Sequence, residues 1–130
     1  MTLSAPVSMV KKITAGAGVS YGHTWIAERD TNLALLPVGY ADGVYRALGG
    51  RIDALINGRL RRSVGRICMD QFMLDLGPDG SAYNEDEVVL IGAQGSESIR
   101  AEDVARLAGT IPYEILTGLN ERVPRVYSGG

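Results

Sequence analysis

The chain contains 130 residues, of which 45% are hydrophobic and 22% are charged, and its formal net charge at pH 7 is -2. This length suits one domain around a single core, and this composition is too apolar for a disordered chain. The slight negative charge argues against nucleic acid as a partner, because binding to a phosphate backbone depends on clustered cations.

Short apolar runs separated by loop-forming residues favour strands in the first third of the chain. Residues 7–13 form a β-branched, apolar run, residues 14–18 interrupt it, and a second strand is expected to begin at Val19. The run 33–38 is almost continuously apolar, as in a strand buried on both faces, although Pro37 favours an edge or a bulge there.

The dipeptide Asn57-Gly58 is the clearest local signal, because both residues tolerate the positive φ angles of a type I′ turn. It predicts a hairpin that joins residues 52–56 to residues 59–64. Residues 67–76 then form another strand candidate, whose later half alternates apolar and polar side chains.

The last third of the chain changes from strand to helical periodicity. A strand is expected at 87–91, ended by Gly92. The apolar residues of 101–108 follow the helical period, with Ser98 available as a cap and Gly109 as a stop.

A second short helix is predicted over residues 110–117, with Pro112 in its first turn and Gly118 at its end. Residues 123–127 are predicted to form a final strand. The 17 glycines suit a fold with frequent turns. The predicted fold class is therefore mainly β, with one or two short helices near the C-terminal end.

Cys68 is the only cysteine and His23 the only histidine. An internal disulfide is therefore impossible, and a zinc site would need carboxylates or a second chain, so we expect no metal. A reducing, cytoplasmic setting is the simpler interpretation. No apolar run is long enough to cross a bilayer and residues 1–10 lack an export-signal pattern, so we expect no membrane partner.

Three segments resemble, in the same order, sequence blocks of the alanine racemase C-terminal domain: 18–25 (GVSYGHTW), 37–43 (PVGYADG) and 64–71 (VGRICMDQ). Two later segments, 111–114 (IPYE) and 122–125 (RVPR), resemble the closing region of that family. Each block is short, but together they extend over nearly the whole chain in the right order. By this resemblance we expect residues 1–130 to form a single barrel-like β domain.

The resemblance implies a reaction that this chain does not complete alone. Full-length members join such a domain to an N-terminal α/β barrel whose lysine holds pyridoxal phosphate as a Schiff base, and the active site forms at a dimer interface. They interconvert L-alanine and D-alanine, which supplies peptidoglycan precursors. Lys11 and Lys12 are the only lysines here, and neither lies in a motif like that of the cofactor lysine. We therefore expect no bound cofactor and no activity without the barrel domain and a second subunit.

Tyr21 matches the family's tyrosine base, which takes or returns the α-proton of a small amino acid on one face. Racemisation needs two groups on opposite sides of a planar carbanion, and the cofactor lysine serves the other face. Because the usual pKa of a phenol is about 10, Tyr21 would need cations nearby, and Arg46 and Arg66 are candidates. From the residues alone, a tyrosine that ends a strand at the surface is the simpler interpretation.

Met69 resembles the residue whose backbone N–H meets the substrate carboxylate, and its neighbours Cys68 and Asp70 belong to the same expected substrate-binding segment. Main-chain amides can fill this role with little dependence on the side chain. The residue types also permit simpler roles: Cys68 as a buried, inert thiol and Asp70 as a residue that fixes a turn.

Four residues match family positions along the corridor by which small substrates reach the cofactor: Tyr40, Asp42, Arg46 and Arg66. A narrow and partly cationic corridor would admit a small zwitterion and exclude bulky side chains. The alternative is a hydrogen-bonded loop with solvated arginines.

Two features are given no role in this chemistry. Residues 59–62 (RLRR) suit a solvated edge strand better than an anion site. Glu121 stands where some relatives have a tyrosine that touches the cofactor phosphate, so that contact is not assigned to this chain.

Two other functions remain open. One is a non-catalytic β-barrel module for binding or oligomerisation, in which Tyr21 would be dispensable. The other is a relative within the enzyme class, a racemase for serine or another small amino acid, or a decarboxylase. We also expect an apolar face, exposed where the barrel domain is missing, to favour a weak homodimer or a domain swap.

Overall fold

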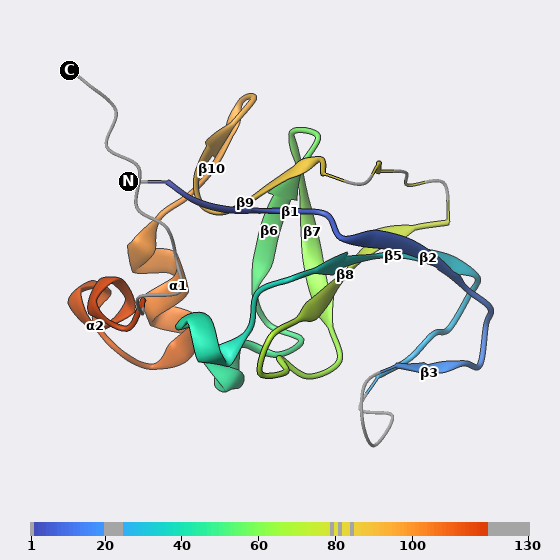
Figure 1. Cartoon of the computed structure of the whole chain (residues 1–130), viewed down its shortest axis with the longest axis horizontal. Helices are drawn as coiled ribbons and strands as arrows, with labels where there is room; N and C mark the ends of the chain where they lie inside the picture. The colour runs from blue at the N-terminus through green and yellow to red at the C-terminus, as the bar shows by residue number, and fades with distance from the viewer. Residues whose placement is uncertain (1, 20–24, 79, 81, 84, 120–130) are drawn as a thin grey trace.

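The structure of the chain is a computed structural model that describes residues 2–19, 25–78, 80, 82–83 and 85–119. Figure 1 shows a curled sheet with two short helices at one side. Its strands are β1 (Leu3–Pro6), β2 (Met9–Ile13), β3 (Gly18–Val19), β4 (Trp25–Ile26), β5 (Thr31–Leu36), β6 (Asp53–Ile56), β7 (Arg59–Val64), β8 (Phe72–Gly77), β9 (Glu87–Gln94) and β10 (Glu97–Ile99). Its helices are the 3-10 turns η1 (Tyr40–Asp42) and η2 (Arg46–Leu48) and the α-helices α1 (Ala101–Ala108) and α2 (Pro112–Thr117).

One antiparallel sheet contains most of the strands, in the order β1-β9-β6-β7-β8-β5-β2, and β10 pairs with β9. The two strands at the ends of this order, β1 and β2, are separated in the chain only by Val7 and Ser8, so the sheet has to curl until its ends approach each other. The N–H of Val7 donates to the Asp86 carbonyl at 2.9 Å, and the N–H of Ser8 donates to the Leu35 carbonyl at 2.8 Å. Within the described residues β1 and β2 do not pair, so the sheet is barrel-like but not closed. The expected mainly β, barrel-like fold is confirmed.

The main core joins the inner face of the sheet to the two α-helices. Leu55, Leu74 and Val89 are fully buried, and Val104 of α1 and Ile115 of α2 pack into the same cluster. Strand β8 alternates buried and half-buried residues as its sequence pattern predicted. Truncating one of these buried leucines to alanine typically costs about 2–5 kcal/mol of stability.

The predicted hairpin is confirmed at residues 57–58. Strands β6 and β7 pair with Ile56 opposite Arg59, and the turn between them has Asn57 at φ 52° and Gly58 at φ 76°. Both angles lie in the left-handed region that a type I′ turn requires.

The N-terminal strand differs from the expectation. The run 7–13 was expected to be one strand, but β2 begins at Met9, and a further strand, β1, precedes it. Leu3 and Ala5 of β1 are buried and alternate with exposed residues. The pairing of β1 with β9 joins distant parts of the chain, which local periodicity does not reveal.

The end of β9 also differs from the expectation. Gly92, expected to end the strand, lies inside it at φ 132°, and β9 continues to Gln94 before a turn at Gly95. Ser98 therefore belongs to β10 and does not cap the following helix. The cap is Arg100, whose backbone N–H donates to the Asp103 carboxylate at 3.0 Å.

The two predicted helices are confirmed. Helix α1 ends at Gly109, which adopts a left-handed conformation at φ 72°, and helix α2 begins with Pro112 in its first turn. In the described part of the chain, no helix has the length and apolar character needed to cross a membrane. The expected strand at 123–127 lies outside the described residues.

We expect Gly58→Ala to lower the free energy of unfolding by about 1 kcal/mol. A Cβ at Gly58 would meet no atom within 4 Å, so the cost comes from holding an L residue at φ 76°. Asn57→Gly is the matched control, because glycine adopts φ 52° freely. Urea denaturation of both variants measures the difference, and an unchanged stability for Gly58→Ala would contradict the assigned turn.

Candidate functional site

The site is built on two neighbouring strands, β5 and β8. They pair antiparallel with Leu36 opposite Phe72, so the chain leaving β5 and the chain entering β8 lie at the same end of the sheet. The segments that continue from them, residues 37–43 and 65–71, carry most of the predicted site residues.

Backbone hydrogen bonds join the two segments. The N–H of Tyr40 donates to the Cys68 carbonyl at 2.9 Å, and the N–H of Ala41 donates to the Met69 carbonyl at 2.9 Å. Gly39 makes this approach possible, since a Cβ there would lie 2.1 Å from the Cys68 carbonyl oxygen. Its φ of -154° is open to any residue, so glycine is required here for space alone.

The hydrogen bond to Cys68 also orients the next amide. Within the trans peptide group between Cys68 and Met69, the carbonyl and the N–H point to opposite sides. Because the carbonyl accepts from Tyr40, the Met69 N–H points away from residues 39–41. Within the described residues it has no hydrogen-bond acceptor. The bond to the carbonyl polarises the peptide group and strengthens this N–H as a donor.

Asp42 holds the first segment in shape. It is 6% exposed, and its carboxylate accepts a hydrogen bond from the Gly39 N–H at 3.1 Å. The N–H of Gly43 ends η1 by donating to the Tyr40 carbonyl at 3.2 Å. This placement agrees with the hydrogen-bonded-loop alternative for Asp42, whose position along a corridor stays a prediction.

An aromatic ring, a cation and an exposed thioether lie around these segments. Tyr40 is 44% exposed, and the guanidinium carbon of Arg46 lies 5.4 Å from the centroid of its ring, within reach of a cation–π interaction. Met69 is 54% exposed. These groups form a partly cationic rim beside the outward-facing amide of Met69.

The remaining predicted residues of the second segment differ in exposure. Arg66 and Asp70 are exposed, while Cys68 is half-buried with its sulfur 4.0 Å from the Arg66 carbonyl oxygen. A Cβ at Gly49, just after η2, would lie 3.4 Å from the Arg66 Cα, so the turn that carries Arg46 packs against this segment. The fold thus brings the Arg46 and Arg66 segments together.

Three residues named in the sequence analysis lie outside the described residues: Tyr21, His23 and Glu121. Lys11 and Lys12 lie on β2, where both are exposed. The described residues contain no group of three or more His, Cys, Asp or Glu side chains arranged to hold a metal ion.

Sequence reasoning missed two features that shape the site, the close approach at Gly39 and the burial of Asp42. A glycine inside a short run such as 37–43 signals a special backbone position, but it does not say whether the reason is φ or space. The partner segment 65–71 becomes evident only once β5 and β8 are known to pair.

We expect Gly39→Ala to lower the free energy of unfolding by about 3 kcal/mol, because the added methyl group would overlap backbone that cannot rotate away. Gly50→Ala is the control, since a Cβ there meets no atom within 4 Å and only the strain of φ 73° remains. Thermal denaturation compares the two. Equal losses of stability would contradict the close contact between the two segments.

Comparisons with known proteins give a consistent result. The family model described as alanine racemase, C-terminal domain, matches residues 1–127. The alanine racemase of Mycobacterium leprae is 59% identical over 128 residues, which are 98% of this chain and 33% of that protein.

Solved structures agree with this match. A crystal structure of alanine racemase from D-cycloserine-producing Streptomyces lavendulae superposes with a TM-score of 0.93 at 51% identity, over 99% of this chain and 34% of that one. Alanine racemase from Bacillus anthracis with bound L-Ala-P gives a TM-score of 0.94 at 40% identity, over 98% of this chain and 32% of that one. The chain therefore spans about a third of the length of the relatives it matches.

Proposed function

This chain belongs to the alanine racemase family and corresponds to the C-terminal domain of its members. We propose that it supplies one side of a racemase active site that other parts of the protein complete. The reaction would interconvert L-alanine and D-alanine. The observation that carries the proposal is the pairing of residues 39–41 with residues 68–69, which leaves the Met69 amide facing outward beside a partly cationic rim.

Met69 would bind the substrate carboxylate through its backbone N–H. A carboxylate accepts strong hydrogen bonds from main-chain amides, and a donor already held in place loses little entropy on binding. Cys68 and Asp70 would line the same segment without a direct chemical step. Because the side chain of Met69 is not the donor, Met69→Ala should retain this contact.

Tyr21 would hold and move the proton at the α-carbon of the substrate. Its hydroxyl would donate to or accept from one face of the carbon, and a base from the barrel domain of the partner subunit would serve the other. Arg46 and Arg66 would favour the phenolate form by their positive charge. Nearby cations are what would let a phenol work as a base near neutral pH.

Pyridoxal phosphate in the full-length enzyme would supply an electron sink for the carbanion. The described residues suit a role beside pyridoxal phosphate better than a role in attaching it. Lys11 and Lys12 are exposed on β2, in an antiparallel pairing with β5 that forms no enclosed site around them. We therefore assign cofactor attachment to the barrel domain and none of it to this chain.

Tyr40, Arg46 and Arg66 would form part of the route by which a small zwitterion enters. The exposed ring and the two exposed guanidinium groups would attract the carboxylate of an amino acid and leave little room for a large side chain. Asp42 would act behind them as a positioning residue, through its hydrogen bond to Gly39.

In the cell, a dimer of the complete enzyme in the cytoplasm would provide D-alanine for peptidoglycan precursors.

We expect the chain alone to show no racemase activity and the chain joined to the barrel domain of a relative to show it. In the joined protein, Tyr21→Phe should lower proton exchange at one face of the α-carbon by at least about a hundredfold, because the phenol is the acid–base group there. Deuterium incorporation from solvent, followed separately for L-alanine and D-alanine, measures each face.

Tyr83→Phe is the matched control, because Tyr83 is 79% exposed and lies outside both segments of the site. It should leave both exchange rates unchanged. Equal exchange from both enantiomers by the Tyr21→Phe protein would contradict the proposed role. Such a result would favour a non-catalytic module in which Tyr21 is dispensable.

A further inference from the structure

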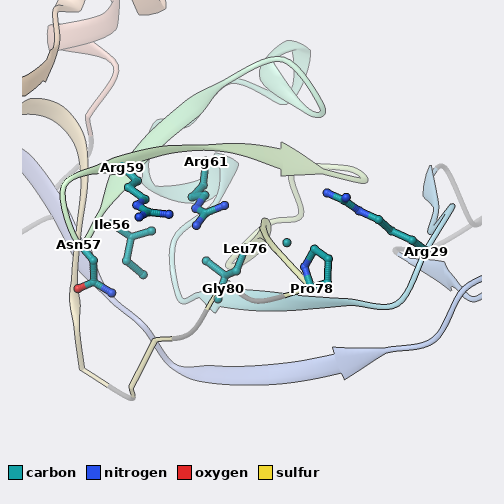
Figure 2. A pocket seen from close by; sticks show the side chains of 9 residues that line it. Arg29, Ile56, Asn57, Arg59, Arg61, Leu76, Pro78 and Gly80 are labelled. Atoms are coloured by element: carbon teal, nitrogen blue, oxygen red, sulfur yellow. The ribbon is translucent and has the colours of Figure 1, made fainter.

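A second group of cations gathers around an open pocket of about 520 Å³, here called the arginine pocket. Arg29, Arg59 and Arg61 line it, together with the apolar residues Ile56, Leu76 and Pro78. Figure 2 shows Arg59 and Arg61 extending toward Leu76 and Pro78, with Arg29 reaching toward them from the far side. None of these residues belongs to the segments 37–43 and 65–71.

Strand geometry explains why the arginines of the run 59–62 separate into two groups. Side chains alternate between the faces of a strand, so Arg59 and Arg61 share one face of β7 and Arg62 lies on the other. Arg62 pairs with Asp53 at 2.6 Å, and this hydrogen bond raises the pKa of Arg62 above its usual value. The prediction of a solvated edge strand for residues 59–62 did not separate these arginines. Among the described residues, only Arg62 of the three has a carboxylate partner.

The three arginines of the pocket form no ion pair with a described residue. None of them has a carboxylate oxygen within 4.0 Å. The Asp75 carboxylate accepts hydrogen bonds from the Thr31 hydroxyl at 2.5 Å and from the Gly77 N–H at 3.0 Å. The Asp30 carboxylate accepts one from the Ala15 N–H at 2.8 Å.

The walls of the pocket are held by hydrogen bonds that do not involve the arginines. The Asn32 side-chain amide donates to the carbonyl oxygens of Pro78 at 3.3 Å and Gly80 at 2.8 Å. Next to Asn57, which also lines the pocket, the N–H of Gly58 donates to the Gln94 side chain at 2.8 Å. A binding space with fixed walls requires little ordering when a ligand enters.

We propose that the arginine pocket binds a phosphate-type oxyanion. Guanidinium groups donate paired, charge-assisted hydrogen bonds whose geometry matches phosphate oxygens, and three such groups suit a polyvalent anion better than a single carboxylate. Free inorganic phosphate and the phosphate group of a larger metabolite share this chemistry.

Sodium phosphate added to the 130-residue chain at constant ionic strength tests the proposal. We expect saturable changes in the amide NMR signals of Asn57 and Gly77, which line the pocket. Arg59→Gln and Arg61→Gln should each weaken binding by about tenfold or more, since each removes a charge-assisted contact. Arg62→Gln removes the same charge from the same strand on its other face and should leave the affinity unchanged.

Four outcomes would overturn the proposal. The first is linear, unsaturated shifts in the unmodified chain, and the second is an equal loss of binding in Arg62→Gln. The third is phosphate binding that appears only after Asp79→Asn. Asp79 lies between Pro78 and Gly80 in the sequence, and this result would mean that its carboxylate neutralises the arginines in the unmodified chain. A polyglutamate peptide that binds more tightly than phosphate and pyrophosphate would assign the pocket to an acidic protein segment instead. Melting temperatures of all variants confirm that each has folded.

Discussion

The antiparallel register between β5 and β8 is the constraint on which the proposed site depends. With Leu36 opposite Phe72, two segments far apart in the sequence leave the sheet side by side. They then continue the pairing as loops, because Gly39 lets the backbone of one approach the carbonyl groups of the other. A shift of one residue in this register would turn every side chain of β5 to the other face and separate Tyr40 from Met69. The site is thus an extension of the sheet itself.

Local signals in the sequence were sufficient to predict the parts of the fold that depend on residues close together in the chain. The Asn57-Gly58 turn, the alternation along β8, the start of α2 at Pro112 and the end of α1 at Gly109 were all predicted correctly. Each rests on a backbone preference or a periodicity that acts within a few residues. The family resemblance, which rests on short sequence blocks in the family's order, added the barrel-like form, and the comparisons confirmed the family.

Features that depend on distant partners were not predicted. Strand β1 is recognisable only through its pairing with β9, and Ser98 was taken as a helix cap because the continuation of β9 beyond Gly92 was not foreseen. The burial of Asp42 and the convergence of Arg29 with Arg59 and Arg61 have the same origin, since each joins elements that the sequence separates. The tyrosine on which the proposed chemistry depends, Tyr21, lies outside the described residues, so its position relative to Arg46 stays a prediction.

The place of β1 in the sheet bears on how the domain is made. Leu3 pairs with Ile91, far later in the chain, so one border of the sheet stays unpaired until the residues of β9 have been synthesised. Contacts of such long sequence separation form slowly, and a strand edge left open is a template for pairing with other chains. Until β9 pairs with β1, the strands already made present an open edge, and such a transiently exposed edge favours aggregation during folding.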